Sequence, residues 1–206
     1  MQFKEFVDWV FHRKKAERKN PDSGEGRSEE HAKIPEENIE DYLQQLDDDL
    51  ADTLLSRVMA KPPKFFEKLV VKILVAMGYG GSVENPGKAI GQTGDDGVDG
   101  VIDQDVLGLD QIYIQAKRWK SGNNVGAGAI RDFFGSLDNK KASKGLFVTT
   151  SNFTPDARET ARKLSKRIVL IDGRQLMRLM IRYGVGCRVD RTLYIKKIDE
   201  DFFNEE

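Results

Sequence analysis

The sequence predicts an α/β fold: a mixed β-sheet with helices on both faces, preceded by a helical N-terminal extension. Two observations carry this prediction. From Pro62 onward, segments with apolar residues at helical spacing alternate with short strand-like runs, in the order helix, three short strands, helix, strand, helix, strand, helix. The chain has 206 residues, of which 39% are hydrophobic, so it can bury one substantial core plus a small appendage.

The first part of the chain is expected to lie outside that core. Residues 1–18 predict a short amphipathic helix, 19–34 lack large apolar residues and predict a flexible linker, and 35–61 predict a connecting helix. The connecting helix could pack against the core or pair with a second chain, and its pattern does not separate the two. Its apolar face is expected to comprise Ile39, Tyr42, Leu43, Leu46, Leu50, Leu54 and Val58.

Residues 62–206 are expected to form the main domain. Proline and glycine mark several of its boundaries: Pro63 precedes the first helix, Gly78 ends it, and Thr154 and Pro155 suit the cap and first residue of a later helix. The expected elements are a helix from Pro63 to about Met77, a hairpin over 94–119, a helix within 125–144, a strand at 145–151, a helix from Pro155 to about Lys166, a strand at 168–172 and a helix at 173–184.

The hairpin carries the most informative residues. Strict alternation in the segment IYIQAKRW puts Gln115 and Lys117 on one face of a strand. Asp99 lies sixteen residues before Gln115, and the turn-rich segment between them can bring its carboxylate beside that face. An acid, an amide oxygen and an ammonium together can hold a divalent ion against a phosphate and activate a water for phosphodiester hydrolysis. The structural alternative is a cross-strand ion pair between Asp99 and Lys117, which contributes about 0.2 to 1 kcal/mol.

The charges are unevenly distributed although the net charge is only −1. Residues 36–52 hold eight acids and no base, whereas residues 158–191 hold ten Lys or Arg against three acids. The basic part suits a polyanionic partner, although a solvated helix face gives the same composition. Two basic stripes at helical spacing are expected, Arg158, Arg162 and Lys166 on one helix and Arg174, Arg178 and Arg182 on the next.

The chain's cysteine and histidines bear on the cellular compartment of the protein and on whether it could hold a zinc ion. The lone cysteine, Cys187, has no partner for an internal disulfide, and charges interrupt the apolar residues of the first helix, which is unlike a signal peptide. A reducing cytoplasm and no membrane segment are therefore expected. No cysteine or histidine pair has the spacing of a zinc site.

Residues 65–188 resemble the Mrr-type (type IV) restriction endonuclease domain of the PD-(D/E)XK nuclease superfamily. The similarity is carried, in order, by the segments FEKLVVKILVAMGYGG, GDDGVDGVI, IYIQAKRW, GLFVTTSNFTPDARETARKLSKRIVLIDG and LMIRYGVG. The resemblance implies a restriction-endonuclease-like fold and a DNA endonuclease that depends on Mg²⁺, with Mn²⁺ as a substitute. It further implies action on double-stranded, methylated DNA in host defence, and two active sites for two strands suggest a homodimer or higher oligomer.

The resemblance also implies roles for individual residues. Asp99 matches the metal-binding acid, Gln115 the position that is usually Glu in the superfamily, and Lys117 the catalytic lysine. Glu67 matches the helix acid that helps to bind the ion in related resolvases, so the expected metal ligands are Asp99, Gln115 and Glu67. The expected DNA contacts are Arg118, Lys120, Arg131, Arg158 and Arg162.

Two positions and the length of the N-terminal part depart from the family pattern. Asp96 replaces a glycine in GDDGVDG and could bind a second ion or cap a turn, and Arg131 stands where Gln is frequent. About sixty residues precede the nuclease core, too few for the winged-helix-like recognition domain usual in this family together with the linker and the connecting helix. Two alternatives therefore stay open: a structure-selective nuclease like a Holliday-junction resolvase, and a DNA-binding or partner subunit without cleavage of its own.

Overall fold

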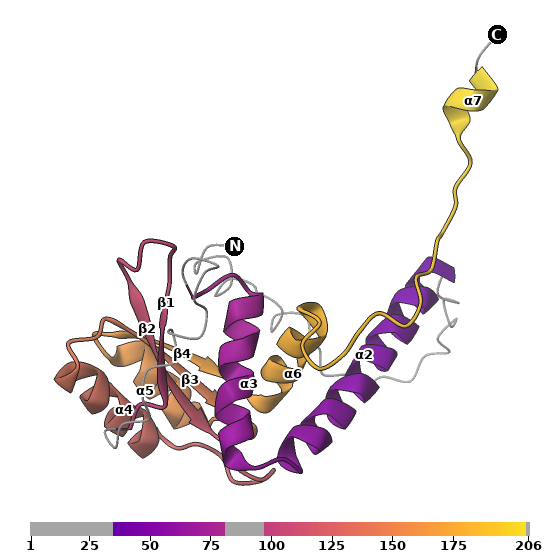
Figure 1. Ribbon diagram of the computed structural model, residues 1–206. Coiled ribbons are helices and arrows are strands. Elements are labelled where there is room, and N and C mark those ends of the chain that lie inside the picture. Colours follow the sequence, from indigo (N-terminus) through magenta and orange to yellow (C-terminus); the bar gives the residue numbers. More distant parts are fainter. Residues whose placement is uncertain (1–34, 81–96, 205–206) are drawn as a thin grey trace, which may run out of the picture.

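The computed structural model describes residues 35–80 and 97–204, and its described strands form one mixed four-stranded sheet in the order β1-β2-β3-β4 (Figure 1). The strands are β1 (Gly100–Asp103), β2 (Gln111–Lys117), β3 (Lys144–Thr149) and β4 (Arg167–Ile171). β1 and β2 are antiparallel, whereas β2, β3 and β4 run parallel. The mixed sheet and the hairpin are as predicted. Of the three strands expected before the second helix of the main domain, the described residues contain two.

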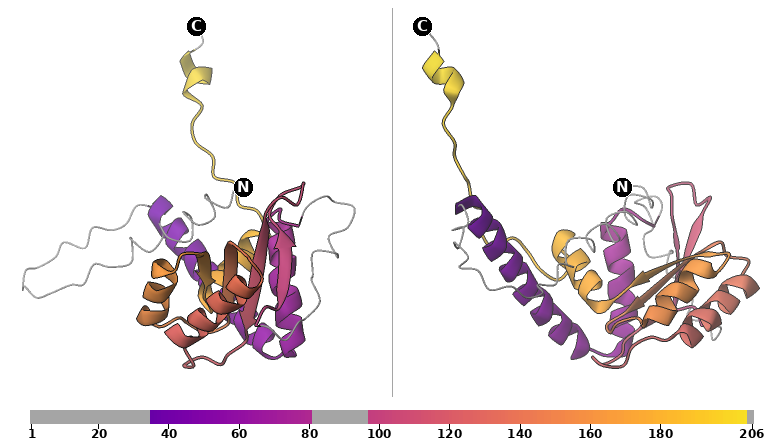
Figure 2. Two further views of the ribbon diagram at one scale, coloured as in Figure 1. Left: turned by 90° about the vertical axis from the view of Figure 1, so that its left-hand side faces the viewer. Right: turned by 180° about the vertical axis from the view of Figure 1, so that it is seen from behind.

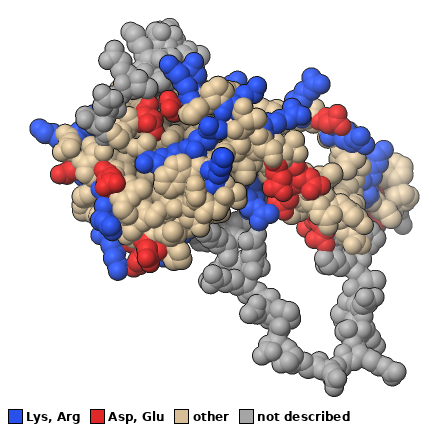
Figure 3. All heavy atoms as spheres, turned by 90° about the horizontal axis from the view of Figure 1, so that it is seen from below, with Lys and Arg blue, Asp and Glu red and all other residues tan. Residues whose placement is uncertain are grey.

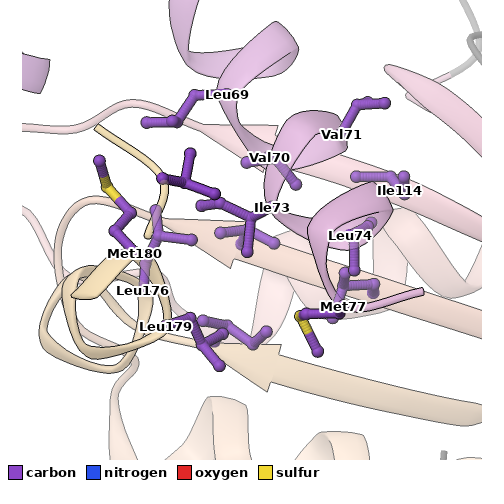
Figure 4. Close-up of a cluster of buried hydrophobic side chains, with 14 of the residues drawn as sticks. Leu69, Val70, Val71, Ile73, Leu74, Met77, Ile114, Leu176, Leu179 and Met180 are labelled. Atoms are coloured by element: carbon purple, nitrogen blue, oxygen red, sulfur yellow. The ribbon is translucent and has the colours of Figure 1, made fainter. Parts of the chain in front are cut away.

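One face of the sheet is covered by α3 (Pro63–Ala76), α6 (Gly173–Arg182) and the last turns of α2 (Pro35–Met59). Figure 4 shows side chains of α3 and α6 meeting over Ile114 of the sheet. Most of the apolar residues along α3 are buried against the sheet, whereas Phe65 near its start is 41% exposed. Gly78, with φ of +96°, follows the helix in the left-handed conformation that favours glycine. This packing fixes the sheet from the side of Ile112 and Ile114.

The opposite face is covered by α4 (Ala127–Asn139) and α5 (Pro155–Lys163). Phe133 of α4 meets Phe147 of β3 edge to face, with ring centroids 5.5 Å apart. Gly145 permits this approach, because a Cβ there would lie 2.7 Å from the Phe133 ring and from Leu137. Helices therefore cover both faces, as the sequence predicted.

The helix α5 is shorter than the sequence predicted. Thr154 caps it as expected, since its Oγ1 accepts a hydrogen bond from Ala157 N at 3.1 Å. The helix ends at Lys163 because Leu164 is extended, which lets the chain return to the sheet at Arg167. The predicted stripe thus loses Lys166, whose Nζ instead donates to Ala142 O at 2.8 Å.

The helix α2 is present as predicted, but its expected apolar face is only partly used. Leu54 and Val58 near its end are buried, whereas Tyr42 and Leu46 are 66% and 64% exposed. Arg178 of the second predicted stripe ties α6 to this helix through Asp48, with 3.6 Å between Nη2 and Oδ1. Arg174 lies 4.0 Å from the same carboxylate oxygen. The end of α2 packs against the core, while its first half carries an exposed apolar surface.

The chain leaves the domain after α6 and ends, among the described residues, with the short helix α7 (Glu200–Asn204). Figures 1 and 2 show α7 standing clear of the remaining helices and strands in all three views. None of the helices in the described part of the chain is long and apolar enough to cross a membrane. The predicted N-terminal helix (1–18) and linker (19–34), as well as Asp96, lie outside the described residues, and the division into domains stays a prediction.

Candidate active site

Pairing of β1 with β2 brings Asp99 beside Gln115. Asp99 N donates to Ile114 O at 2.8 Å, which aligns the residue before β1 with the middle of β2. The Asp99 carboxylate then accepts two hydrogen bonds at Oδ2, from Gln115 Nε2 at 2.5 Å and from Ala116 N at 2.6 Å. The predicted approach of Asp99 to the polar face of β2 is therefore found.

Asp99 and Gln115 occupy the face of the sheet that α4 and α5 cover. Gln115 pairs in register with Phe147, a core residue of that face, and only 8% of Gln115 is exposed. Asp99 is half-buried, and its Oδ1 makes no hydrogen bond with a described residue. One carboxylate oxygen is thus fixed by the strand, while the other is available to a ligand.

Gly97 allows the backbone just before Asp99 to pack closely against α4. Its φ is +72°, and a Cβ at this position would lie 2.8 Å from Ser136 Oγ and 3.7 Å from Gln115 Oε1. Any larger residue would push against the α4 side chain and crowd the amide of Gln115. The sequence pattern GDDGVDG contained this glycine, but the spacing alone gave it no role.

Lys117 lies two residues beyond Gln115 and therefore on the same face of β2. The side chain is half-buried, with Nζ 5.7 Å from the centroid of the Trp119 ring. No ion pair within 4.0 Å joins Lys117 to Asp99, both of which belong to the described part of the chain. The structural alternative of a cross-strand ion pair is thus not found, and Asp99 bonds Gln115 and Ala116 instead.

Two buried threonines after β3 hold the end of β2. Thr149 Oγ1 donates to Lys117 O at 2.8 Å, and Thr150 Oγ1 donates to Trp119 O at 2.7 Å. Thr150 Oγ1 also accepts from Trp119 N at 2.9 Å. The backbone from Lys117 to Trp119 is therefore held against the end of β3. Sequence reasoning missed these residues, although two hydroxyls directly after the apolar run GLFV were a usable signal.

Glu67 is not joined to the other predicted ligands. It is half-buried on α3, which covers the opposite face of the sheet from Gln115 and Lys117. It makes no hydrogen bond or ion pair with any residue in the ranges 35–80 and 97–204. Its role as a metal ligand stays a prediction.

The donor set suits a hard divalent cation. Asp99 and Gln115 offer carboxylate and amide oxygens, and Mg²⁺ is commonly held by one or two carboxylates while it keeps several waters. Within the described residues no group of three or more His, Cys, Asp or Glu could hold a metal ion. A carboxylate and an amide oxygen fit Mg²⁺ that keeps several water ligands.

A cleft opens at the carboxyl ends of β2 and β3, and Asp99, Gln115 and Lys117 are not among its lining residues. Its volume is about 470 Å³, and it is bounded by the end of α2, the segment after β2, the segment after β3 and α6. Trp119, Thr150 and Asn152 are among its lining residues. Figure 3 views the molecule from the side on which α2 ends and α3 begins, and basic side chains spread across that side next to a separate acidic group.

The predicted DNA contacts fall into two groups. Arg118 and Arg158 have internal partners: Arg118 Nη1 donates to Met59 O at 2.7 Å, and Arg158 pairs with Asp172 at 3.0 Å. Lys120, Arg131 and Arg162 are exposed. The first group has a structural function at the end of α2 and the start of α6. Contact with DNA stays a prediction for all five residues.

Comparison with known proteins identifies relatives of this chain. Residues 58–180 match the family model of the Mrr catalytic domain, described as a restriction endonuclease. The chain is 41% identical over 169 residues to the type IV methyl-directed restriction enzyme EcoKMrr of Escherichia coli (strain K12), covering 82% of this chain and 54% of that protein. It is 27% identical over 121 residues to the uncharacterized protein y4cE of Sinorhizobium fredii (strain NBRC 101917 / NGR234), covering 54% of this chain and 29% of that protein.

A solved structure shares the fold. The DNA modification-dependent restriction endonuclease AspBHI superposes with a TM-score of 0.50 at 17% identity, over 82% of this chain and 41% of that one. The chain spans about half the length of the enterobacterial relative that it matches. The family model, in contrast, covers more than half of this chain and includes Glu67, Asp99, Gln115 and Lys117. On this evidence the chain belongs to the restriction endonuclease family of the Mrr catalytic type.

Proposed function

We propose that this chain is a Mg²⁺-dependent DNA endonuclease that hydrolyses phosphodiester bonds. The observation that carries the proposal is the Asp99 carboxylate fixed by Gln115 and Ala116 N, on the face of β2 that also bears Lys117. Membership of the restriction endonuclease family supports it, because the family description names this class of enzyme.

Each residue has a distinct task in this proposal. Asp99 and Gln115 would hold Mg²⁺, which when bound supplies Lewis-acid activation of the phosphate and of a water. Lys117, as an ammonium, orients the attacking water or a phosphate oxygen and offsets the negative charge that develops at phosphorus. Gln115 contributes no charge, so the site attracts the cation less strongly than two carboxylates would, and Glu67 is proposed to add the missing charge.

The substrate is proposed to be double-stranded, methylated DNA. The relative with 41% identity is described as methyl-directed, and its description is the support for this choice. The exposed cations Lys120 and Arg131 are proposed to contact phosphates, which would position the duplex without reading its sequence. Reading a methyl group needs shaped contacts in a groove, for which the cleft at Trp119 and Asn152 is the candidate.

The proposal is tested on supercoiled plasmid, methylated and unmethylated, with Mg²⁺ or EDTA. Wild type should nick or linearise plasmid only with metal, and Asp99→Asn should lose this activity while it still melts cooperatively. Asp103→Asn is the matched control, since Asp103 accepts from Gln111 Nε2 at 3.1 Å on the same hairpin, four residues further along β1. Cleavage by Asp99→Asn at the wild-type rate would refute the assignment of the site.

A four-way DNA junction, added as competitor, separates the substrate classes. A methylated linear duplex should compete better than an unmethylated duplex or a junction of equal length. Preference for the junction would instead favour the resolvase-like alternative, which uses the same Asp99, Gln115 and Lys117.

A further inference from the structure

We propose that residues 199–204 of one copy of this chain dock into a basic groove on a second copy. The basic groove is a cavity of about 430 Å³ between α5, β4 and the first turn of α6. This inference goes beyond the proposed nuclease function and does not depend on it. The residues that line the groove are Arg158, Ala161, Arg162, Leu164, Ser165, Lys166, Arg167, Ile168, Val169, Leu170 and Gln175.

The docking segment exposes aromatic side chains that contact no core. Phe202 and Phe203 are 70% and 71% exposed, and α7 has no buried residue. Their rings meet only each other edge to face, at 5.2 Å between centroids. Several residues before them are also exposed and apolar, among them Tyr194 and Ile195. Exposed apolar side chains in this number, although charged residues such as Lys196 and Lys197 lie between them, are typical of an interaction site.

Charge complementarity selects the groove as the receptor. Residues 199–206 hold five acids and no Lys or Arg. The lining of the basic groove holds four Lys or Arg and no acid, and two of these cations, Arg158 and Lys166, also pair with Asp172 and Asp138 outside the lining. Arg162 is one of the exposed cations of the lining, with 69% of its side chain accessible and a loose 3.8 Å contact to Glu159. The acids beside the two phenylalanines could therefore pair with the exposed cations at the mouth of the groove while the phenyl rings enter the cavity.

The interior of the basic groove suits an aromatic side chain. Leu164, Ile168 and Leu170 line it together with the cations, so an apolar floor lies under a charged rim. Its volume falls in the range of pockets that take small organic groups. β4 is also an edge strand of the described sheet, so the extended residues before α7 can pair with its backbone.

The path of the chain favours a second copy as the donor. Gly186 lies against α6 and α2, since a Cβ there would be 2.9 Å from Met180 Cε and 3.8 Å from Leu54 Cδ2. The chain therefore leaves the domain at α2, and Figures 1 and 2 show it continuing away from the body. The groove lies at α5 and β4, which β3 separates from β2 and the candidate active site. Exchange of the segment in both directions gives a closed, two-fold dimer.

The test is sedimentation equilibrium of the full chain over a range of concentrations, without DNA or metal. Wild type should dimerise, and Asp201→Lys and Arg162→Glu should each raise the dimer Kd by roughly tenfold or more. The double variant Asp201→Lys with Arg162→Glu should recover most of the affinity, because the pair is restored with reversed charges. Phe202→Ser combined with Phe203→Ser should also weaken the dimer. Lys72→Glu, an exposed charge reversal on α3, is the matched control and should leave Kd unchanged.

Three results would overturn the proposal. They are a monomeric wild type at every concentration, single charge reversals with an unchanged Kd, and a double variant no tighter than the weaker single variant. Circular dichroism of each variant confirms that it is folded. Since no DNA is cut in this experiment, its outcome is separate from that of the plasmid assay.

Discussion

At the residue scale, the hydrogen bond between Asp99 and Gln115 makes a prediction about metal affinity. Gln115→Glu would replace the amide donor by a second carboxylate, so the bond to Asp99 Oδ2 is lost and two negative charges meet. In EDTA the variant should be destabilised by about 1–3 kcal/mol. With Mg²⁺ the loss should be reversed, because the ion then binds between two acids and stabilises the folded state by mass action.

Thermal melting with and without Mg²⁺ measures both effects. Gln111→Met is the control, because it removes the corresponding side-chain bond to Asp103 on the same two strands without adding a second carboxylate. The control should be destabilised in EDTA without recovery in Mg²⁺. Equal Mg²⁺ responses of the two variants would show that Asp99 and Gln115 form no special metal site.

Lys117 provides a second prediction, which separates catalysis from stability. Since no ion pair joins it to Asp99, Lys117→Met keeps most of the apolar contact with Trp119 and removes only the ammonium. Plasmid cleavage should fall by about 10²–10³-fold, the range for loss of one transition-state donor. The melting temperature should change little. A large fall in stability would indicate that the lysine holds the hairpin rather than the reacting phosphate.

Tyr79 gives a prediction for alkaline pH. Burial, followed by the neighbouring Tyr183, raises the pKa of the Tyr79 hydroxyl to about 12, and its Oη has no hydrogen-bond partner within the described structure. The unfolded chain ionises this tyrosine near pH 10, so stability is complete below pH 10 and falls as the pH rises towards 12. Tyr79→Phe should therefore remove part of the alkaline loss. Urea titrations at pH 8 and above pH 10 check it, and identical pH dependence in both proteins would contradict it.

At the scale of elements, the clamp between β3 and β2 is predicted to position Lys117. Thr150→Val removes two hydrogen bonds to Trp119 and should cost about 1–3 kcal/mol of stability. It should also lower the rate of plasmid cleavage while DNA affinity stays close to wild type. Thr150→Ser retains the hydroxyl and should restore the rate. A fall in stability without any fall in rate would show that the clamp has only a structural role.

Local patterns predicted those elements whose determinants lie within a few residues of each other. The cap at Thr154 and the alternation in β2 are of this kind, and both are found. The 3.6-residue periodicity of α2, in contrast, shows that an apolar face exists but not what covers it. Leu46 and Leu54 lie on the same predicted face, yet Leu54 is buried and Leu46 is exposed. The end of α5 depends on where β4 begins, which is a tertiary constraint that no pattern near Lys166 contains.

In the candidate site, too, contacts between residues close in sequence could be predicted, and contacts set by the tertiary fold could not. Asp99 and Gln115 could be predicted because a hairpin joins them, and the short connection limits where they can meet. Thr150 acts from a strand that is adjacent only in the folded sheet, about thirty residues later in the chain. Its contribution therefore requires the β2–β3 register, which the sequence does not specify on its own.

At the scale of the whole molecule, the separation of charge predicts how the chain binds DNA. The net charge of −1 gives no general attraction to a polyanion, so affinity must come from the local spread of exposed cations. If Lys120 and Arg131 each neutralise one phosphate, the slope of log Kobs against log salt should fall by about 0.9 for each residue changed to alanine. Binding should weaken by a similar factor on methylated and unmethylated duplexes, because phosphate contacts position the duplex without distinguishing its sequence.

Fluorescence anisotropy with a labelled duplex, titrated across a range of salt concentrations in EDTA, measures these slopes without cleavage. Lys72→Ala on α3 is the control, since it removes an exposed cation from a helix that is not proposed to contact DNA, and its slope should equal that of wild type. If Lys120→Ala and Arg131→Ala change no more than this control, then the phosphates lie elsewhere. The basic groove at α5 would then be the surface to test next. Arg162→Ala would show which ligand it binds. Loss of DNA affinity with an unchanged dimer Kd would assign the groove to nucleic acid instead of the docking segment.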